Sequence, residues 1–310
     1  SDNGAVRMNN AHPLINYCTI KNNSASGIYA WNLSGTLKIK NNTISNNTAS
    51  YGGGIYSSGG MVTISGNTIS NNTASSSGGG IYSSSSSTVT VSGNTISNNT
   101  SSSGSGGGIS ANATATISGN TISNNTASSS GGGIYSYSST ISGNTISNNS
   151  ASYGGGIYTY EGTFVISDNT ISNNTATSSG GGIYSYSYYS SSTVTISDNT
   201  ISNNTASSSG GGIYSSISSS GTISGNTISN NTTSSNGGGI YVENSIVTKN
   251  SVTMNSAKNA SAVYYGGSSK DFTYNTIMGN KATDSSDTYT VCISSNPTFN
   301  YNNIFSNTAT

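Results

Sequence analysis

The chain has 310 residues with eight basic and eight acidic side chains, so its formal net charge is zero. Only 5% of the residues are charged, whereas about a quarter is usual for a soluble domain. A neutral chain has no electrostatic reason to bind nucleic acid or an anionic membrane, and both are excluded as expected partners. No apolar run approaches the roughly 20 residues of a membrane helix, so membrane insertion is not expected either.

Gly, Ser, Thr and Asn dominate the composition. Low hydrophobicity can indicate disorder, but disordered chains usually carry high net charge or scattered Pro. Here Pro occurs only at Pro13 and Pro297, and Ile recurs at regular intervals, which favours a repetitive fold. The chain starts at Ser1 without an initiator Met, which together with the composition predicts a secreted protein whose signal peptide has been removed.

The first predicted element is a short lead-in segment over residues 1–14, and a single solenoid is expected over residues 15–310. The first turn of this solenoid, or rung, begins at Ile15 and ends at Asn23. It has the spacing I-x-x-N-x-I-x-x-N, with Cys18 in the place of the first Asn.

The same spacing returns along the chain at intervals of 24 to 30 residues, usually followed by a Ser-rich stretch and G-G-G-I-Y. A period in this range indicates a solenoid, here of about twelve rungs. Each rung adds one residue to each of two Asn columns. The first column is Asn42, Asn67, Asn94, Asn120, Asn144, Asn169, Asn199, Asn226, Asn250, Asn275 and Asn302. The second is Asn23, Asn47, Asn72, Asn99, Asn125, Asn149, Asn174, Asn204, Asn231, Asn255, Asn280 and Asn307.

Within each rung, Ile and Val occur in short runs bounded by Gly and Asn, which predicts three short strands, for example around Ile64, Ile69 and Ile81. Parallel crossovers are nearly always right-handed, so the expected fold is an all-β, right-handed parallel β-helix. The Ile side chains should point inward. The Asn columns should lie at the bends, where Asn tolerates unusual backbone angles, and should form internal amide ladders.

Several motifs resemble those of a known family. Phe272-Thr273-Tyr274-Asn275 and Phe299-Asn300-Tyr301-Asn302 have the form F-x-x-N, and the stretch from Gly131 to Ile134 has the form G-G-G-I. These motifs resemble the FxxN and GGA(I/L/V) repeats of polymorphic outer-membrane proteins and related β-helical surface adhesins. The resemblance extends over nearly the whole chain and implies a surface location with an adhesive or structural role.

A tyrosine follows the third Ile of most rungs, so a tyrosine column is expected on the outer surface. Its rings could stack on sugars or pack against a neighbouring solenoid; alternatively they could stack on one another across rungs. Tyr29 and Tyr264 would continue the column at its ends, and Ser110 interrupts it. The candidate contact residues are Tyr56, Tyr82, Tyr135, Tyr158, Tyr184, Tyr214 and Tyr241.

Two further patterns suggest lesser alternatives. Outward Thr and Ser flank the second Ile, as in Thr68 and Ser70, and such an array resembles the faces of ice-binding solenoids. Asp168 and Asp198 lie on adjacent rungs, where paired carboxylates would suit a glycosidase or a cation site, although Asp is also a normal turn residue. Because His12 is the sole His, no catalytic triad or His-based metal site can form, and neither an enzyme nor a cofactor is expected.

Eight Asn residues stand in N-glycosylation sequons, each as the outward Asn just before a ladder Asn. Glycans on successive rungs would collide, so full occupancy is not expected. The candidate acceptors are Asn46, Asn71, Asn98, Asn124, Asn148, Asn173, Asn203 and Asn230.

The ends and the two cysteines suggest self-assembly. Neither end shows a capping element, so head-to-tail stacking of copies is expected. Cys18 and Cys292 lie ten rungs apart, about 48 Å, so they cannot pair within one chain but could form an intermolecular disulfide. The sequence thus predicts an extracellular structural protein that polymerises into a filament, sheath or coat. The alternative is a surface adhesin that binds glycans or a neighbouring cell surface.

Overall fold

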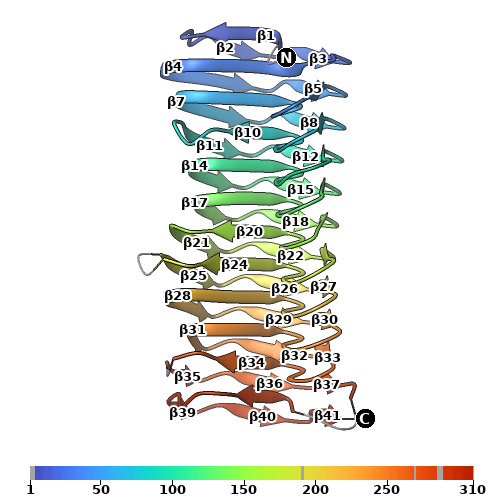
Figure 1. Ribbon diagram of the computed structural model, residues 1–310, viewed down its shortest axis with the longest axis vertical. Coiled ribbons are helices and arrows are strands. Elements are labelled where there is room, and N and C mark those ends of the chain that lie inside the picture. Colours follow the sequence, from blue (N-terminus) through green and yellow to red (C-terminus); the bar gives the residue numbers. More distant parts are fainter. Residues whose placement is uncertain (1–3, 190–191, 269, 285–288, 310) are drawn as a thin grey trace. The chain divides into compact units, whose positions relative to one another are not determined.

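The computed structural model describes residues 4–189, 192–268, 270–284 and 289–309 (Figure 1). In these residues the regular structure consists of β-strands, without helices. The chain divides into two compact units, Ser1–Ala151 (unit 1) and Ser152–Thr310 (unit 2), and each unit is a parallel β-solenoid. The all-β fold with three strands per rung is therefore confirmed.

Unit 1 contains three parallel sheets, each built from one kind of strand. Sheet A is formed by β1 (Gly4–Asn9), β2 (Leu14–Asn16), β4 (Ser26–Lys40), β7 (Ile55–Ser65), β10 (Ile81–Ser83), β11 (Thr88–Ser92), β14 (Ile109–Ser118) and β17 (Ile134–Ser142). Sheet B is formed by β3 (Thr19–Lys21), β5 (Thr43–Ser45), β8 (Thr68–Ser70), β12 (Thr95–Ser97), β15 (Thr121–Ser123) and β18 (Thr145–Ser147). Sheet C is formed by β6 (Thr48–Ala49), β9 (Thr73–Ala74), β13 (Thr100–Ser101), β16 (Thr126–Ala127) and β19 (Ser150–Ala151).

Unit 2 repeats this plan. Its sheet A consists of β20 (Ile157–Tyr160), β21 (Thr163–Ser167), β24 (Ile183–Ser187), β25 (Thr193–Ser197), β28 (Ile213–Ser224), β31 (Ile240–Thr248), β34 (Val263–Gly266), β35 (Phe272–Thr273), β38 (Val291–Ile293) and β39 (Phe299–Asn300). Its sheet B consists of β22 (Thr170–Ser172), β26 (Thr200–Ser202), β29 (Thr227–Ser229), β32 (Ser251–Thr253), β36 (Thr276–Met278) and β40 (Asn303–Phe305). Its sheet C consists of β23 (Thr175–Ala176), β27 (Thr205–Ala206), β30 (Thr232–Thr233), β33 (Ser256–Ala257), β37 (Lys281–Ala282) and β41 (Thr308–Ala309).

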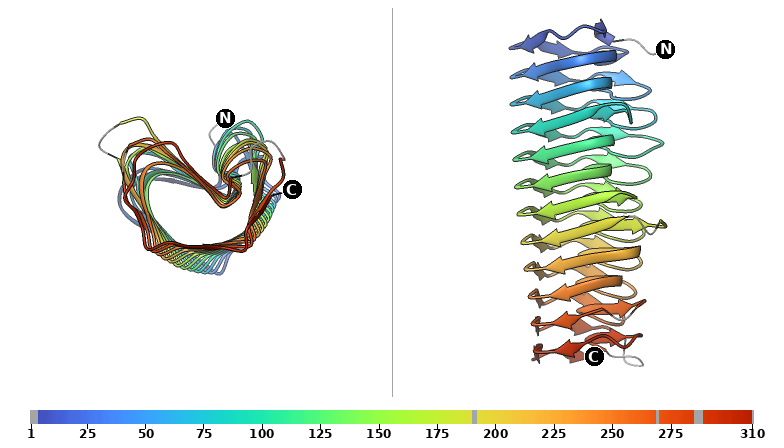
Figure 2. Two further views of the ribbon diagram at one scale, coloured as in Figure 1. Left: turned by 90° about the horizontal axis from the view of Figure 1, so that it is seen from below. Right: turned by 90° about the vertical axis from the view of Figure 1, so that its left-hand side faces the viewer.

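Each rung runs through sheets A, B and C in turn and closes as an indented loop, as the view along the rungs in Figure 2 shows. Every sheet-B strand has a sheet-C strand after it except β3, which gives about eleven complete turns among the described residues. The segment that was predicted to be a lead-in contributes a strand to sheet A. Its strand β1 pairs in parallel with β4, from Gly4 opposite Ser26 to Asn9 opposite Trp31.

The core consists of stacked aliphatic side chains. Ile64, Ile69 and Ile81, expected to point inward, are all fully buried. The strands pair in register, so that Ile81 lies opposite Ile55 in sheet A and inward-facing side chains stack on inward-facing side chains of the next rung. Only a few aliphatic side chains fill each rung, and buried Asn side chains share the interior with them.

The two Asn ladders are present in both units and confirm the expected amide bonding. Asn72 is fully buried, and its Nδ2 donates to the carbonyl of Ile44 at 3.0 Å and to Oδ1 of Asn99 at 3.0 Å. The same Oδ1 accepts the backbone N–H of Asn72 at 3.0 Å. Each ladder amide therefore joins three successive rungs and satisfies buried backbone groups at the bend.

One expectation about these bends was wrong. The unusual backbone angle falls on the residue before each ladder Asn: Gly66 has φ 64° before Asn67, and Asn71 has φ 57° before Asn72. The ladder residues themselves keep a negative φ. Gly and Asn tolerate the left-handed conformation best, so either residue suits the backbone at both turn positions.

The G-G-G segment is required by close approach of backbones. A Cβ added at Gly79 would lie 2.5 Å from the carbonyl oxygen of Gly107 and 2.6 Å from backbone atoms of Thr100. The N–H of Gly79 donates to the carbonyl of Gly106 at 3.1 Å, so the segment is also hydrogen-bonded from rung to rung. The glycines thus belong to the scaffold.

Candidate functional site

Each unit carries its own tyrosine column on sheet A. In unit 1, Tyr29, Tyr56 and Tyr82 lie side by side in register, followed by Ser110 and Tyr135. In unit 2 the column runs through Tyr158, Tyr184, Tyr214, Tyr241 and Tyr264.

The tyrosine rings stack face to face along each column. In unit 2, the ring centroids of Tyr184 and Tyr214 are 4.7 Å apart with an interplanar angle of 4°. A further tyrosine, Tyr153, packs edge-on against Tyr184 at 5.3 Å. The column side chains are half-buried, and their faces, which a sugar would need for stacking, contact neighbouring rings instead.

The surroundings raise the pKa of several of these phenols. Burial, together with the neighbouring Tyr214 and Tyr158, raises the pKa of Tyr184 well above its usual value. Burial and the carboxylate of Glu243 raise the pKa of Tyr241, whose hydroxyl donates to Glu243 Oε1 at 3.0 Å. At neutral pH the column therefore presents hydrogen-bond donors at the edges of the rings.

A second aromatic feature in unit 2 escaped the sequence reasoning. Glu161 is only 3% exposed, and its carboxylate accepts bonds from the N–H of Tyr188 at 2.9 Å and of Tyr189 at 3.4 Å. The hydroxyls of Ser187 and Ser192 donate to the same carboxylate at 3.1 and 3.3 Å. This buried carboxylate holds the turn after β24. The feature of the sequence that could have indicated this turn is an isolated acidic residue, Glu161, just before the longest rung, which has 30 residues.

That turn exposes two aromatic rings. The side chains of Tyr188 and Tyr189 are 72% and 63% exposed, and their rings meet edge to face at 5.9 Å. Unlike the column rings, they are not stacked face to face, and most of their surface meets solvent. We call these two residues the exposed tyrosine pair.

Asp168 and Asp198 occupy turn positions. Both are exposed, with φ 59° and 58°, in the place that Gly66 and its equivalents hold in other rungs. This favours the turn interpretation over a catalytic or cation-binding pair. Among the described residues, no three His, Cys, Asp or Glu side chains gather closely enough to hold a metal ion.

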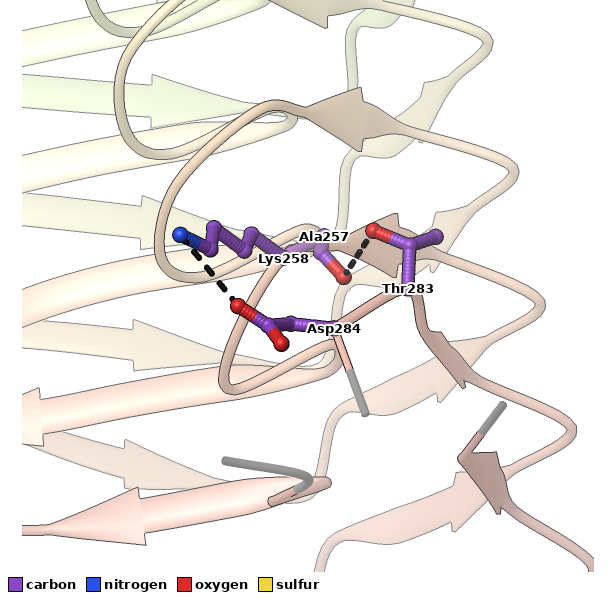
Figure 3. A network of polar contacts seen from close by, with 4 residues as sticks. All are labelled: Ala257, Lys258, Thr283 and Asp284. Atoms are coloured by element: carbon purple, nitrogen blue, oxygen red, sulfur yellow. Dashed lines mark hydrogen bonds and ion pairs between the residues drawn. The ribbon is translucent and has the colours of Figure 1, made fainter. Parts of the chain in front are cut away.

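The few other charges lie mostly near the C-terminal rungs. Lys258 Nζ forms an ion pair with Asp284 at 3.2 Å (Figure 3). Beside it, Thr283 Oγ1 donates to the carbonyl of Ala257 at 3.2 Å. These contacts connect neighbouring rungs across sheet C and present no concentrated charge to a ligand.

The Thr and Ser array lies on sheet B as expected. Thr68, Thr95 and Thr121 stand in register and are exposed, whereas Ser70 and its equivalents are half-buried. The outermost hydroxyls of this face are therefore almost all Thr, in a regular uncharged row.

The eight candidate glycosylation residues, here called the acceptor column, all lie in the turn between sheets B and C. Each is exposed and has φ between 55° and 58°. The structure also draws attention to sequons that the sequence reasoning missed. Asn41 is exposed in the other turn, and the ladder residues Asn99 and Asn231 are followed by Thr-Ser and Thr-Thr. Further sequons begin at Asn22, Asn32, Asn112 and Asn259.

The two cysteines occupy different columns. Cys18 is exposed, and its backbone N–H donates to Asn42 Oδ1 at 2.9 Å, so it holds a ladder position. Cys292, in β38, lies in register with Tyr264 of β34 and therefore continues the tyrosine column of unit 2. In-register stacking of two copies would not align these columns, so the expected intermolecular bond would require an offset between copies.

Comparison with known proteins gives one result. The family model for the right-handed β-helix region matches residues 1–69, 34–199 and 187–310. No curated protein and no solved structure matches the chain. Within the described residues, no helix is long and apolar enough to span a membrane.

Proposed function

Because this chain belongs to the right-handed β-helix family, we propose that it is an extracellular structural member of that family. Its solenoid would serve as a stiff element of a filament, sheath or surface coat, with copies of itself as the main partner. Right-handed β-helix domains occur both in enzymes and in proteins without catalytic activity. We place this chain in the second group.

One observation supports this proposal above the others: the recurring side chains bond along the axis to their own equivalents. Asn99 donates to Asn125, and Tyr184 stacks on Tyr214. The ladder amides and the column rings, the two most regular features of the repeat, thus hold each rung on the next.

The surface chemistry also suits self-association. The chain has no net charge, and the outward residues of sheet B are Thr and Ser in long rows. A net charge near zero removes the repulsion between copies that normally keeps proteins monomeric.

Negative-stain electron microscopy and sedimentation velocity across a range of concentrations test the proposal. We expect ordered assemblies whose fraction grows with concentration. Monodisperse protein at all concentrations would contradict self-assembly, and release of reducing sugars from a panel of polysaccharides would contradict the non-enzymatic role.

A second candidate function is glycan binding by an adhesin, which the exposed tyrosine pair favours. Exposed aromatic rings suit stacking on sugars, and the absence of nearby basic side chains in this turn favours a neutral glycan. A glycan array should then show binding that is lost on changing Tyr188 and Tyr189 to Ser. Tyr17→Ser is the matched control, because Tyr17 is 80% exposed but lies in unit 1. Equal loss in both variants would argue against this site.

A further inference from the structure

We propose that the acceptor column carries N-linked glycans, so that the turn between sheets B and C forms a glycosylated edge on each unit. This proposal needs an extracellular route for the chain but does not depend on self-assembly.

The fold separates the two asparagines of each sequon. Asn98 is exposed with φ 55°, whereas the next residue, Asn99, is fully buried in the ladder. The amide of Asn98 therefore projects into solvent, where an attached glycan has room. No acceptor side chain makes a hydrogen bond to another described residue, so modification of the amide would break no contact of the fold.

The other turn of each rung provides an internal comparison. Gly93 precedes Asn94 and Thr95 in the same left-handed conformation, with φ 62°. A Cβ at Gly93 would meet nothing within 4 Å, so Asn would fit there and would create a sequon.

Most rungs nevertheless have Gly or Asp at that first turn and Asn at the second. Both residue types, Gly and Asn, satisfy the left-handed backbone. Because the local structure is the same in the two turns, the fold alone does not explain Asn at the second turn. A requirement for the side-chain amide explains why the second turn has Asn.

The chemistry is that of ordinary N-glycosylation of Asn-x-Thr. The Nδ2 of the acceptor forms a bond to the anomeric carbon of an oligosaccharide carried on a lipid diphosphate. The bond between that carbon and the diphosphate oxygen breaks, the lipid diphosphate leaves, and the amide nitrogen loses one proton.

The spacing of the rungs limits occupancy. Successive acceptors lie one strand spacing apart, about 4.8 Å, which is narrower than a branched oligosaccharide. We therefore expect gaps, with glycans on non-adjacent rungs in any one molecule.

The test is secretion of the full chain, behind a signal peptide, from eukaryotic cells with N-glycosylation. Trypsin is unsuitable, because no Lys or Arg lies between Lys40 and Lys249, so peptides are made with elastase. Enzymatic deglycosylation in ¹⁸O-labelled water then marks each occupied Asn by its mass. We expect label on acceptor-column residues and none on Asn99 or Asn231, and intact mass should show fewer glycans than acceptors.

Two variants sharpen the test. Gly93→Asn moves a sequon to the equivalent first turn, and the new Asn should also accept glycan in folded, secreted protein. Asn98→Gly leaves only the buried Asn99 sequon on that rung, and secreted protein should carry no glycan there. Secreted protein without glycan on any acceptor, or with label on Asn99 as frequent as on the acceptors, would overturn the proposal.

Discussion

The most informative perturbation of this molecule is Asn125→Ala, in the middle of the second Asn ladder of unit 1. The side chain of Asn125 is fully buried. Its Nδ2 donates to the carbonyl of Ile96 at 2.9 Å and to Asn149 Oδ1 at 3.0 Å. Its Oδ1 accepts both the backbone N–H and the Nδ2 of Asn99, at 2.9 and 3.0 Å.

The cost of the substitution follows from the partners left behind. Alanine removes all four bonds, but Asn149 Oδ1 still accepts the backbone N–H of residue 125, and Asn99 Nδ2 still donates to Ile69. The carbonyl of Ile96 lies in the β12–β15 ladder and loses only the bond from the side chain, so the group left without a partner is the N–H of Asn99. A buried unsatisfied group costs about 1–3 kcal/mol, so the free energy of unfolding should fall by about 1–3 kcal/mol.

The assay compares Asn125→Ala with Asn124→Gly, its neighbour in the acceptor column. Gly accepts the left-handed backbone of position 124, where φ is 56°, so this control should change stability by less than about 0.5 kcal/mol. Denaturant unfolding followed by circular dichroism gives the midpoints. Because repeat arrays can unfold in stages, hydrogen exchange of the peptide containing Asn99 gives the local effect. Equal midpoints and equal exchange for the two variants would refute the ladder argument.

Three further predictions follow from other contacts. Gly79→Ala should destabilise unit 1 by about 3 kcal/mol, because its Cβ would lie 2.5 Å from a backbone oxygen. The comparison is Gly93→Ala, which has open space but should cost about 1–2 kcal/mol for its φ of 62°; a Gly79→Ala midpoint no lower than that of Gly93→Ala would contradict this. Burial raises the pKa of Tyr265 to about 12, whereas in the unfolded chain this phenol ionises near pH 10. The free energy of unfolding should therefore fall as the pH rises from 10 through 12. A Tyr265→Phe variant whose unfolding midpoint depends on pH in the same way as that of the unchanged protein would contradict this. A disulfide between Cys18 of one copy and Cys292 of the next should give multimers on non-reducing electrophoresis that collapse with reductant and are absent in Cys18→Ser, whereas monomer in every lane would contradict this.

The fold was predictable because its signals are repeated. One rung of Ile and Asn is ambiguous, but the same spacing returning twelve times fixes the core residues and the ladder. The position of the left-handed residue was misassigned, because Asn is common both in such turns and in ladders. Only the φ values of Asn71 and Asn72 distinguish the two roles.

The site was less predictable for a different physical reason. The sequence places the tyrosines in one column, but the ring rotamers decide whether the faces meet solvent or one another. The sequence also gives no clue to which backbone donors surround Glu161, since these come from a turn about 27 residues further along the chain.

The variation in rung length indicates where specific recognition could arise. The two ladder residues of a rung are always five apart, as in Asn67 and Asn72, whereas the rung itself varies from 24 to 30 residues. The longest interval, from Asn169 to Asn199, gains its extra length on sheet A, between β24 and β25, where the exposed tyrosine pair lies. The ladder bonds on either side remain at 3.0 Å despite this insertion. An insertion there leaves the ladders intact, so this bend can acquire binding residues without breaking the ladder bonds. The ladder Asn and core Ile positions of the invariant half cannot, because their side chains are buried and the ladder amides already bond to the neighbouring rungs.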